Sequence, residues 1–210
     1  MIEKEGSILS VREDIKVFDC TIRDGGLVNN FKFTDEFVKE HYKTCVAAGI
    51  DYMEIGKNNS TTIMSEDEFG CWNFSKEEDI RRIVGNNDTG MKIAVMSDIG
   101  RTVKEELMHK EDSVVDMVRI ATYIHQIPAA IELIEDAHAK GYETTVNIMA
   151  ISKSFDDELD EVLLALSKTS VDVIYIADSF GSFYPEQINR LTEKYLKVAK
   201  ESGKKVGIHT

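Results

Sequence analysis

The stretch KVFDCTIRDGGLVNNF, residues 16–31, decides the fold, because an apolar run that predicts a β-strand ends there in charged residues and two glycines. Arg23 and Asp24 stand side by side where the predicted strand breaks into a loop. Such a pair is either a local ion pair at the surface or the floor of a site. The rest of the chain decides between these two interpretations.

Short apolar or β-branched runs recur along the chain and predict seven strands. They fall at residues 15–20, 50–56, 91–97, 116–122, 142–152, 171–179 and 204–210. Stretches with helical spacing lie between several of them, at residues 34–49, 128–141, 154–170 and 184–203. Strands that alternate with helices indicate repeated βα units and a parallel sheet.

The predicted strands are apolar on both faces, which is typical of parallel strands covered by helices. Two architectures fit this pattern: an open doubly wound sheet and a (β/α)8 barrel. No G-x-G-x-x-G motif follows the first predicted strand, so the dinucleotide-binding form of the open sheet lacks support.

Polar residues at the strand ends favour the barrel. They lie at or near the predicted carboxyl ends, in different units: Asp24, Glu54, Asp98, Thr122, Asn147, Asp178, Ser179 and His209. In a barrel these ends converge on the face that carries active sites. We therefore predict an α/β fold, an incomplete (β/α)8 TIM barrel with about seven parallel strands, as a single domain over residues 1–210. A complete barrel needs eight strands and about 250 residues, so we interpret the chain as a truncated form or a fragment.

The charge balance argues against nucleic acid as a partner, because 25 basic residues stand against 38 acidic ones, a net charge of −13. No apolar run approaches the ~20 residues of a membrane span, and the polar residues 1–14 are unlike a signal peptide. The three cysteines are odd in number and form no C-x-x-C motif, which indicates reduced thiols. We predict a cytoplasmic protein without a membrane partner.

The connection after the second predicted strand, residues 56–76, is long and carries three aromatic residues, Phe69, Trp72 and Phe74. A loop of this length is either a lid or binding loop, or an ordered excursion that packs its aromatic side chains on the barrel rim. Both interpretations stay open. Lys57 and Asn58 lie nearest the strand end and could reach a substrate.

The motif DCTIRDGG, residues 19–26, resembles the D-x-T-L-R-D-G signature of the DRE-TIM metallolyases. That family includes 3-hydroxy-3-methylglutaryl-CoA lyase, the isopropylmalate and homocitrate synthases and 4-hydroxy-2-oxovalerate aldolase. Other stretches resemble the family's later strands in the right order: DYMEIG (51–56), VNIMAIS (146–152), IYIADSFG (174–181) and VGIHT (206–210). The resemblance spans roughly residues 15–210.

The resemblance implies a divalent metal ion, which the family holds with the aspartate of the first motif and both histidines of an H-x-H motif. Asp24 and His209 match two of these ligands, and the second histidine would stand just past Thr210. A carboxylate, imidazoles and open water positions suit Mg²⁺ or Mn²⁺, with Co²⁺ or Zn²⁺ as further options.

The resemblance also implies a reaction on a small 2-oxo acid, whose carboxylate and keto oxygen would meet the ion. The ion would act as a Lewis acid on the enolate formed when a carbon–carbon bond breaks or forms. Arg23 would direct a fixed cation at the same developing charge. Ser179 would help to hold the substrate carboxylate, and Asn147 would either bind substrate or satisfy barrel backbone groups. The family suggests a homodimer.

This chain departs from the family pattern at one position. The 4-hydroxy-2-oxovalerate aldolases carry a histidine shortly after the Arg-Asp pair as general base, where this chain has Gly26 or Leu27. Either another group serves as base, for which His125 is a candidate, or the substrate differs from theirs. We expect Asp19 and Glu54 to be buried partners of Arg23 or of lysines, and Asp178 to be a turn residue.

Three functions remain open on these grounds. The leading one is a metal-dependent aldolase or lyase that acts next to a 2-oxo group. The second is a Claisen-type acyl-CoA synthase, and the third is a non-catalytic relative that binds a small carboxylate.

Overall fold

The computed structural model describes residue 12 and residues 14–209. The prediction about residues 1–14 falls almost entirely outside the described residues, and so does Thr210 at the end of the last predicted strand.

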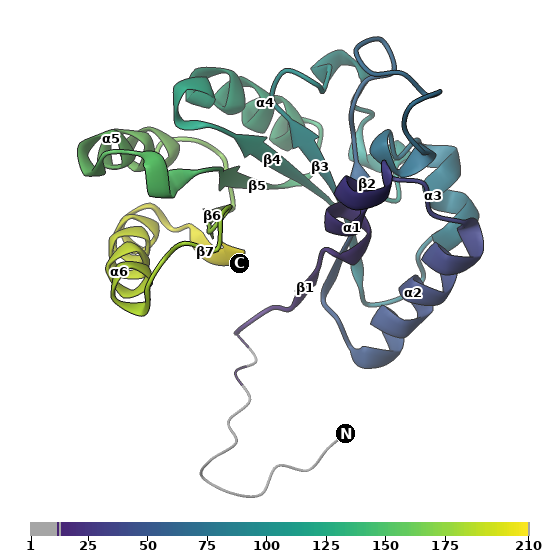
Figure 1. Ribbon diagram of the computed structural model, residues 1–210, viewed down its shortest axis with the longest axis horizontal. Coiled ribbons are helices and arrows are strands. Elements are labelled where there is room, and N and C mark those ends of the chain that lie inside the picture. The colour runs from purple at the N-terminus through teal and green to yellow at the C-terminus, as the bar shows by residue number, and fades with distance from the viewer. Residues whose placement is uncertain (1–11, 13, 210) are drawn as a thin grey trace, which may run out of the picture.

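Seven parallel strands form one sheet in which each strand pairs with the next along the chain. They are β1 (Phe18–Asp19), β2 (Tyr52–Lys57), β3 (Lys92–Asp98), β4 (Met117–Thr122), β5 (Glu143–Ile148), β6 (Val173–Ala177) and β7 (Lys205–His209). The sheet curls, and helices cover its outer side (Figure 1). The predicted architecture, an incomplete (β/α)8 barrel with seven parallel strands, is confirmed.

Six α-helices accompany the sheet within the described part of the chain. They are α1 (Thr21–Asn29), α2 (Asp35–Ala48), α3 (Glu77–Val84), α4 (Ile127–Ala139), α5 (Asp156–Leu166) and α6 (Pro185–Ser202). Single 3₁₀ turns lie in the connections: η1 (Cys71–Asn73), η2 (Lys104–Glu106), η3 (Lys110–Asp112), η4 (Ile124–Gln126) and η5 (Ile151–Lys153). The four helices that we predicted are present, as α2, α4, α5 and α6.

Our prediction of a loop after the first strand is wrong, because the segment TIRDGGLVN, Thr21–Asn29, forms α1. The Asp19 carboxylate accepts hydrogen bonds from the backbone N–H of Thr21, 3.1 Å away, and from its hydroxyl, 2.9 Å away, at the helix start. Ile22 on this helix is fully buried. Tertiary burial therefore overrides the poor helix propensity of two glycines.

Gly26 allows close packing within the protein itself. A Cβ atom at Gly26 would lie 2.2 Å from the ring of Phe31, which is only 3% exposed. The absence of a side chain at this position lets the ring lie directly against α1.

The strands divide their side chains between two environments. Alternate residues such as Val118, Ile120 and Ile174 are buried in the apolar core that the helices cover. The residues between them face the barrel interior. Arg119 lies in this second set, paired in register with Met96 of β3 and Thr145 of β5.

The long connection after β2 packs into the core, so the interpretation as an ordered excursion is confirmed. Trp72 is fully buried and Phe74 is 3% exposed. The Asn59 side-chain amide donates a hydrogen bond to the Asn73 side-chain oxygen, 2.9 Å away. Lys57 is not free to reach a substrate, because its Nζ lies 2.6 Å from Asp98 Oδ2 in a buried ion pair.

Across the residues that the structure describes, no helix combines the length and the apolar character that crossing a bilayer requires.

Candidate active site

Asp24 and His209 lie close together although they belong to opposite ends of the sheet. Asp24 stands in the first turn of α1, directly after β1, and His209 is the last residue of β7. His209 Nε2 lies 3.5 Å from Asp24 Oδ2. Because β1 and β7 are the two edge strands, the curvature of the sheet must bring these side chains together.

Cys20 completes a cluster with these two side chains. One ligand atom from each of Cys20, Asp24 and His209 lies within 4.8 Å of the others. An open depression of about 390 Å³ adjoins the cluster and is lined by Phe18, Cys20, Thr21, Asp24, Ile208 and His209. The cluster is therefore accessible to a small molecule.

The donor set fits a divalent ion. Two ligands about 2.1 Å from one ion lie roughly 3–3.5 Å apart, and the Asp24 and His209 atoms have such a separation. One carboxylate and one imidazole suit Mn²⁺, Mg²⁺, Co²⁺ or Zn²⁺. Burial, and then the nearby Arg23 cation, hold the pKa of His209 below its usual range. The imidazole is therefore neutral near pH 7 and keeps the lone pair that a ligand needs.

Arg23 faces both of these ligand side chains from the barrel interior. It is 7% exposed, and its Nη1 donates a hydrogen bond to Asp24. Its Nη2 lies 3.3 Å from His209 Nε2. Although burial works against it, the carboxylates of Glu54 and Asp24 hold the pKa of Arg23 above its usual range.

Glu54 is the buried partner that we predicted for Arg23. Its Oε2 accepts hydrogen bonds from Arg23 Nε, 2.8 Å away, and from Arg119 Nη1, 2.7 Å away. Burial works against the charge, but the two guanidinium groups hold the pKa of Glu54 below its usual range. Glu54 is the third residue of β2 and therefore lies deeper in the barrel than the strand end where we had placed it.

Arg119 is a residue that our sequence analysis missed. It is fully buried in the middle of β4 and joins the cluster of Glu54 and Arg23. The signal was present, since Arg119 is the one charged residue inside the apolar run MVRIAT, residues 117–122. A charge in such a strand is retained only where it finds a partner.

Asp19 does not pair with Arg23 or a lysine, so that part of the prediction is wrong. Its Oδ1 lies 2.7 Å from His41 Nε2, and the same nitrogen lies 3.5 Å from Cys45 Sγ. A catalytic Cys–His–Asp relay uses both ring nitrogens, one for each partner. Because both contacts fall on Nε2, this cluster ties β1 to α2 and does not activate the thiol.

Asn147 and Ser179 lie in different surroundings. Asn147 is buried, and its side-chain oxygen accepts a hydrogen bond from Arg119 Nη2, 3.4 Å away. Ser179 is exposed, and its hydroxyl accepts a hydrogen bond from the Ala150 backbone N–H, 3.0 Å away. Neither has a hydrogen bond to Asp24 or His209 within the described residues, so their roles toward substrate stay predictions.

Asp178 is a turn residue, as we predicted. Its carboxylate oxygens accept hydrogen bonds from the backbone N–H groups of Ser182, 3.0 Å away, and Phe183, 3.2 Å away.

No replacement for the missing base lines the depression among the described residues. His125 is exposed and stacks on Tyr123, and neither residue lines the depression. Burial, followed by the Glu54 charge, raises the pKa of the Cys20 thiol to about 12, so the thiol stays protonated. Of the two residues that we placed at the aldolase base position, Gly26 has no side chain and Leu27 is apolar and 62% exposed.

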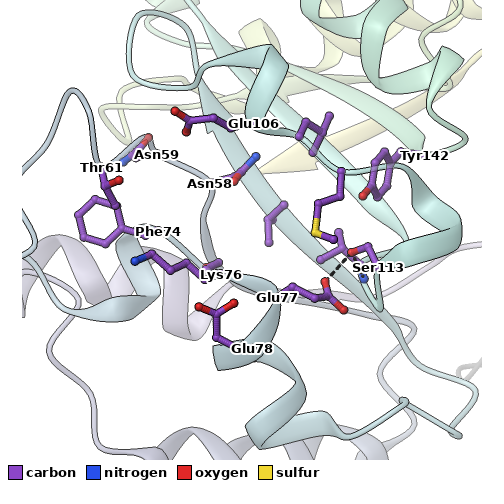
Figure 2. Close-up of a pocket in the computed structure, with 15 residues that line it drawn as sticks. Asn58, Asn59, Thr61, Phe74, Lys76, Glu77, Glu78, Glu106, Ser113 and Tyr142 are labelled. Atoms are coloured by element: carbon purple, nitrogen blue, oxygen red, sulfur yellow. Dashed lines mark hydrogen bonds between the residues drawn. The ribbon is translucent and has the colours of Figure 1, made fainter.

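A second cavity, of about 250 Å³, lies away from this cluster, between the start of α3 and the outer face of β3 (Figure 2). Asn58 lines it, but none of the predicted metal-binding or catalytic residues does. Glu77 on its wall accepts hydrogen bonds from Ser113 and from the Val114 backbone, which is a structural role. The lining holds three glutamates, Glu77, Glu78 and Glu106, against one lysine, Lys76, and this acidic excess disfavours a 2-oxo acid anion.

Comparison with known proteins places these observations in a family context. The HMGL-like family model matches residues 14–210. An oxaloacetate decarboxylase of Mycobacterium tuberculosis (strain ATCC 25618 / H37Rv) is 31% identical over 189 residues, which cover 87% of this chain and 53% of that protein. The 4-hydroxy-2-oxovalerate aldolase 6 of Rhodococcus jostii (strain RHA1) is 25% identical, over 82% of this chain and 48% of that protein.

A solved structure supports the fold. The hydroxymethylglutaryl-CoA lyase of Pseudomonas aeruginosa matches with a TM-score of 0.67 at 16% identity, over 92% of this chain and 66% of that chain. The chain spans about half the length of the curated relatives it matches.

Proposed function

This chain belongs to the HMGL-like family, and from that premise we propose that it is a metal-dependent carbon–carbon lyase for a small 2-oxo acid. The observation that carries the proposal is the 3.5 Å approach of Asp24 and His209, with the Arg23 guanidinium facing both. A divalent ion held by these two side chains, Mn²⁺ or Mg²⁺ first, would supply Lewis acidity toward the keto oxygen.

Arg23 adds a fixed cation beside the same oxygen. When the C3–C4 bond of the 2-oxo acid breaks, its electrons form an enolate between C2 and C3, and negative charge develops on the keto oxygen. Arg23 donates a hydrogen bond to Glu54 and is almost fully buried, so its side chain needs little reorganisation to stabilise that charge.

The residues at the aldolase base position, Gly26 or Leu27, favour decarboxylation over aldol cleavage. Aldol cleavage requires a group that accepts the proton of the 4-hydroxyl. Loss of CO₂ from a carboxylate attached to C3 of a 2-oxo diacid requires none, because the electrons of the C3–carboxylate bond move directly toward the keto oxygen at C2. With Gly26 or Leu27 at the base position and the Cys20 thiol protonated, we propose a 2-oxo diacid as the substrate class.

A relative whose name is oxaloacetate decarboxylase, at 31% identity, agrees with this substrate class. Cleavage of a 4-hydroxy-2-oxo acid is the second candidate, since several relatives at 24–26% identity are 4-hydroxy-2-oxovalerate aldolases. The Claisen-type synthase is not favoured. Lys57 and Arg101, which could have met the phosphates of CoA, both face Asp98.

A pyruvate assay tests the proposal. The chain, loaded with Mn²⁺, is given oxaloacetate and separately 4-hydroxy-2-oxo acids. We expect faster pyruvate release from oxaloacetate. Asp24→Asn should lower kcat and Mn²⁺ affinity by about 10²-fold or more, because a direct ligand matters at least as much as its supporting groups. The same variant with Mn²⁺ also measures oxaloacetate loss caused by the free ion.

Asp67→Asn is the matched control, because Asp67 is exposed on the connection after β2 and distant in sequence from both ligands. It should leave turnover and Mn²⁺ binding unchanged. An Asp24→Asn protein that kept both would remove the proposed function.

The homodimer and the cytoplasmic location stay predictions. Sedimentation equilibrium of the purified chain measures the first, and fractionation of the source cells measures the second.

A further inference from the structure

Arg119 has contacts beyond the ion pair with Glu54 that neutralises its buried charge. Its guanidinium carbon lies 4.4 Å from the ring centre of Phe18 and 4.6 Å from that of Tyr175, so two aromatic faces enclose it. Such contacts fix the guanidinium group as well as stabilise its charge.

The hydrogen bonds of Arg119 connect four strands or strand ends. Its Nη1 lies 2.7 Å from Glu54 Oε2 on β2 and 3.3 Å from Cys20 Sγ after β1. Its Nη2 lies 3.4 Å from Asn147 Oδ1 on β5. Arg119 itself belongs to β4, so its side chain bridges the interior of the barrel.

Glu54 connects Arg119 to Arg23. The same oxygen, Oε2, receives both Arg119 Nη1 and Arg23 Nε, whereas Oε1 has no hydrogen-bond partner among the described residues. With Nε held at Glu54, the two Nη groups of Arg23 point toward Asp24 and His209. The direction of Arg23 therefore depends on how the Glu54 carboxylate is oriented.

The buried part of the cluster carries an excess of positive charge. Two arginines share one buried glutamate, and the second anion beside Arg23 is the Asp24 carboxylate, whose side chain is 42% exposed at the depression. A fixed positive charge in a water-excluded interior favours negative charge that develops nearby.

We propose that Arg119 is a positioning residue that acts through Glu54: it directs the Arg23 guanidinium at Asp24 and His209 and adds fixed positive charge beneath them. The effect on turnover rests on the proposed function, whereas the effect on Arg23 itself does not.

The first test measures turnover. Arg119→Met, which keeps an apolar body without the charge, should lower kcat about 10²-fold with little change in KM, because Arg23 acts on charge that develops during the reaction. Arg119→Lys keeps the charge without the planar guanidinium group, and its kcat should be about tenfold lower than that of the unchanged protein. Arg82→Met is the matched control, since Arg82 is an exposed arginine that pairs with Asp35 and Asp79, and it should keep kcat.

A double-mutant cycle separates positioning from general damage. If Arg119 acts through Glu54, the kcat of Arg119→Met combined with Glu54→Gln should match that of the slower single variant. Losses that multiply, or a folded Arg119→Met protein with unchanged kcat, would overturn the proposal.

The second test does not depend on any reaction. The Nε–H group of Arg23, held 2.8 Å from Glu54, should give a distinct, slowly exchanging signal in ¹⁵N NMR spectra. That signal should shift and exchange faster in Arg119→Lys, and stay in place in Arg82→Met. Arg119→Lys also decides the question if Arg119→Met does not fold.

The two failures are therefore distinguishable. If the position and exchange rate of the Arg23 Nε–H signal are unchanged in Arg119→Lys, the positioning role is overturned, whatever the turnover. A signal that responds, in a protein without turnover of any 2-oxo acid, supports the positioning role and removes the proposed function.

Discussion

At the scale of single residues, Arg23 and Asp24 are neighbours in sequence with different surroundings. The Arg23 side chain is 8% exposed and the Asp24 side chain is 42% exposed. Successive residues of a helix point about 100° apart, so one can enter the barrel interior while the next faces the depression. The pair that the sequence presents as one charged unit is therefore split between a buried support and an accessible ligand.

Glu54→Gln tests the buried support through its pH dependence. The ordinary pKa of 4.5 is lowered in the folded protein, so the folded state favours the carboxylate. The stabilisation is present above about pH 4.5 and is lost as the pH falls through the lower folded-state pKa. Glu54→Gln should cost about 3–5 kcal/mol at neutral pH, since it leaves two buried cations without their counter-charge.

Denaturant unfolding of both proteins from pH 7 to pH 3 measures this difference. The two unfolding free energies should converge as the pH falls. A difference that stays constant over the range would show that Glu54 carries no such charge in the folded state.

At the scale of elements, α1 shows how packing decides the structure of a poor helix sequence. The helix contains two adjacent glycines, and Asn30 ends it with φ of 55°. Gly26 is required by the Phe31 ring, whereas a Cβ at Gly25 would meet its nearest neighbour, Phe33, at 3.3 Å. The two glycines therefore have different reasons to be present.

Paired alanine substitutions test this difference. Gly26→Ala should destabilise the protein by about 1–3 kcal/mol, because the buried Phe31 ring must move. Gly25→Ala should change stability by less than about 1 kcal/mol, because the gain in helix propensity opposes a small shift of Phe33. Thermal unfolding compares the two, and equal losses would contradict the packing role of Gly26.

At the scale of the whole molecule, the central strands of the curled sheet are more deeply buried from solvent than its last strand. Every residue of β4 is buried, whereas β7 includes exposed positions such as Ile208, which is 52% exposed. β4 pairs on both sides, and β7 pairs with β6 alone in the described structure. Strands at the edge open more easily than central ones.

Amide hydrogen exchange of this chain should reflect that gradient. The amides of β7 should exchange about tenfold faster, or more, than those of β4, because fewer contacts must break to expose them. Amides of β3 and β5 serve as internal references and should resemble β4. Equal protection of β7 and β4 would mean that another surface covers the β7 edge.

The architecture could be predicted from the sequence, because the strand and helix patterns are local and recur along the chain. Apolar runs separated by helical stretches predicted all seven strands and four of the helices, and polar residues at strand ends predicted a common face. The prediction of a loop where α1 forms was wrong, and Glu54 lies in the middle of β2, further from the strand end than we expected. Glycine content and strand ends are judged from neighbours in sequence, whereas burial is decided by distant residues.

By itself, the sequence determined the βα repeat and the family motif with Arg23 and Asp24. Only the tertiary structure decided that His209 comes within 3.5 Å of Asp24, that Asp19 pairs with His41, and that Arg119 holds Glu54. The physical reason is that periodicity reports which face a residue occupies along its own strand. The curvature of the sheet and the side-chain packing inside it determine which residue stands opposite.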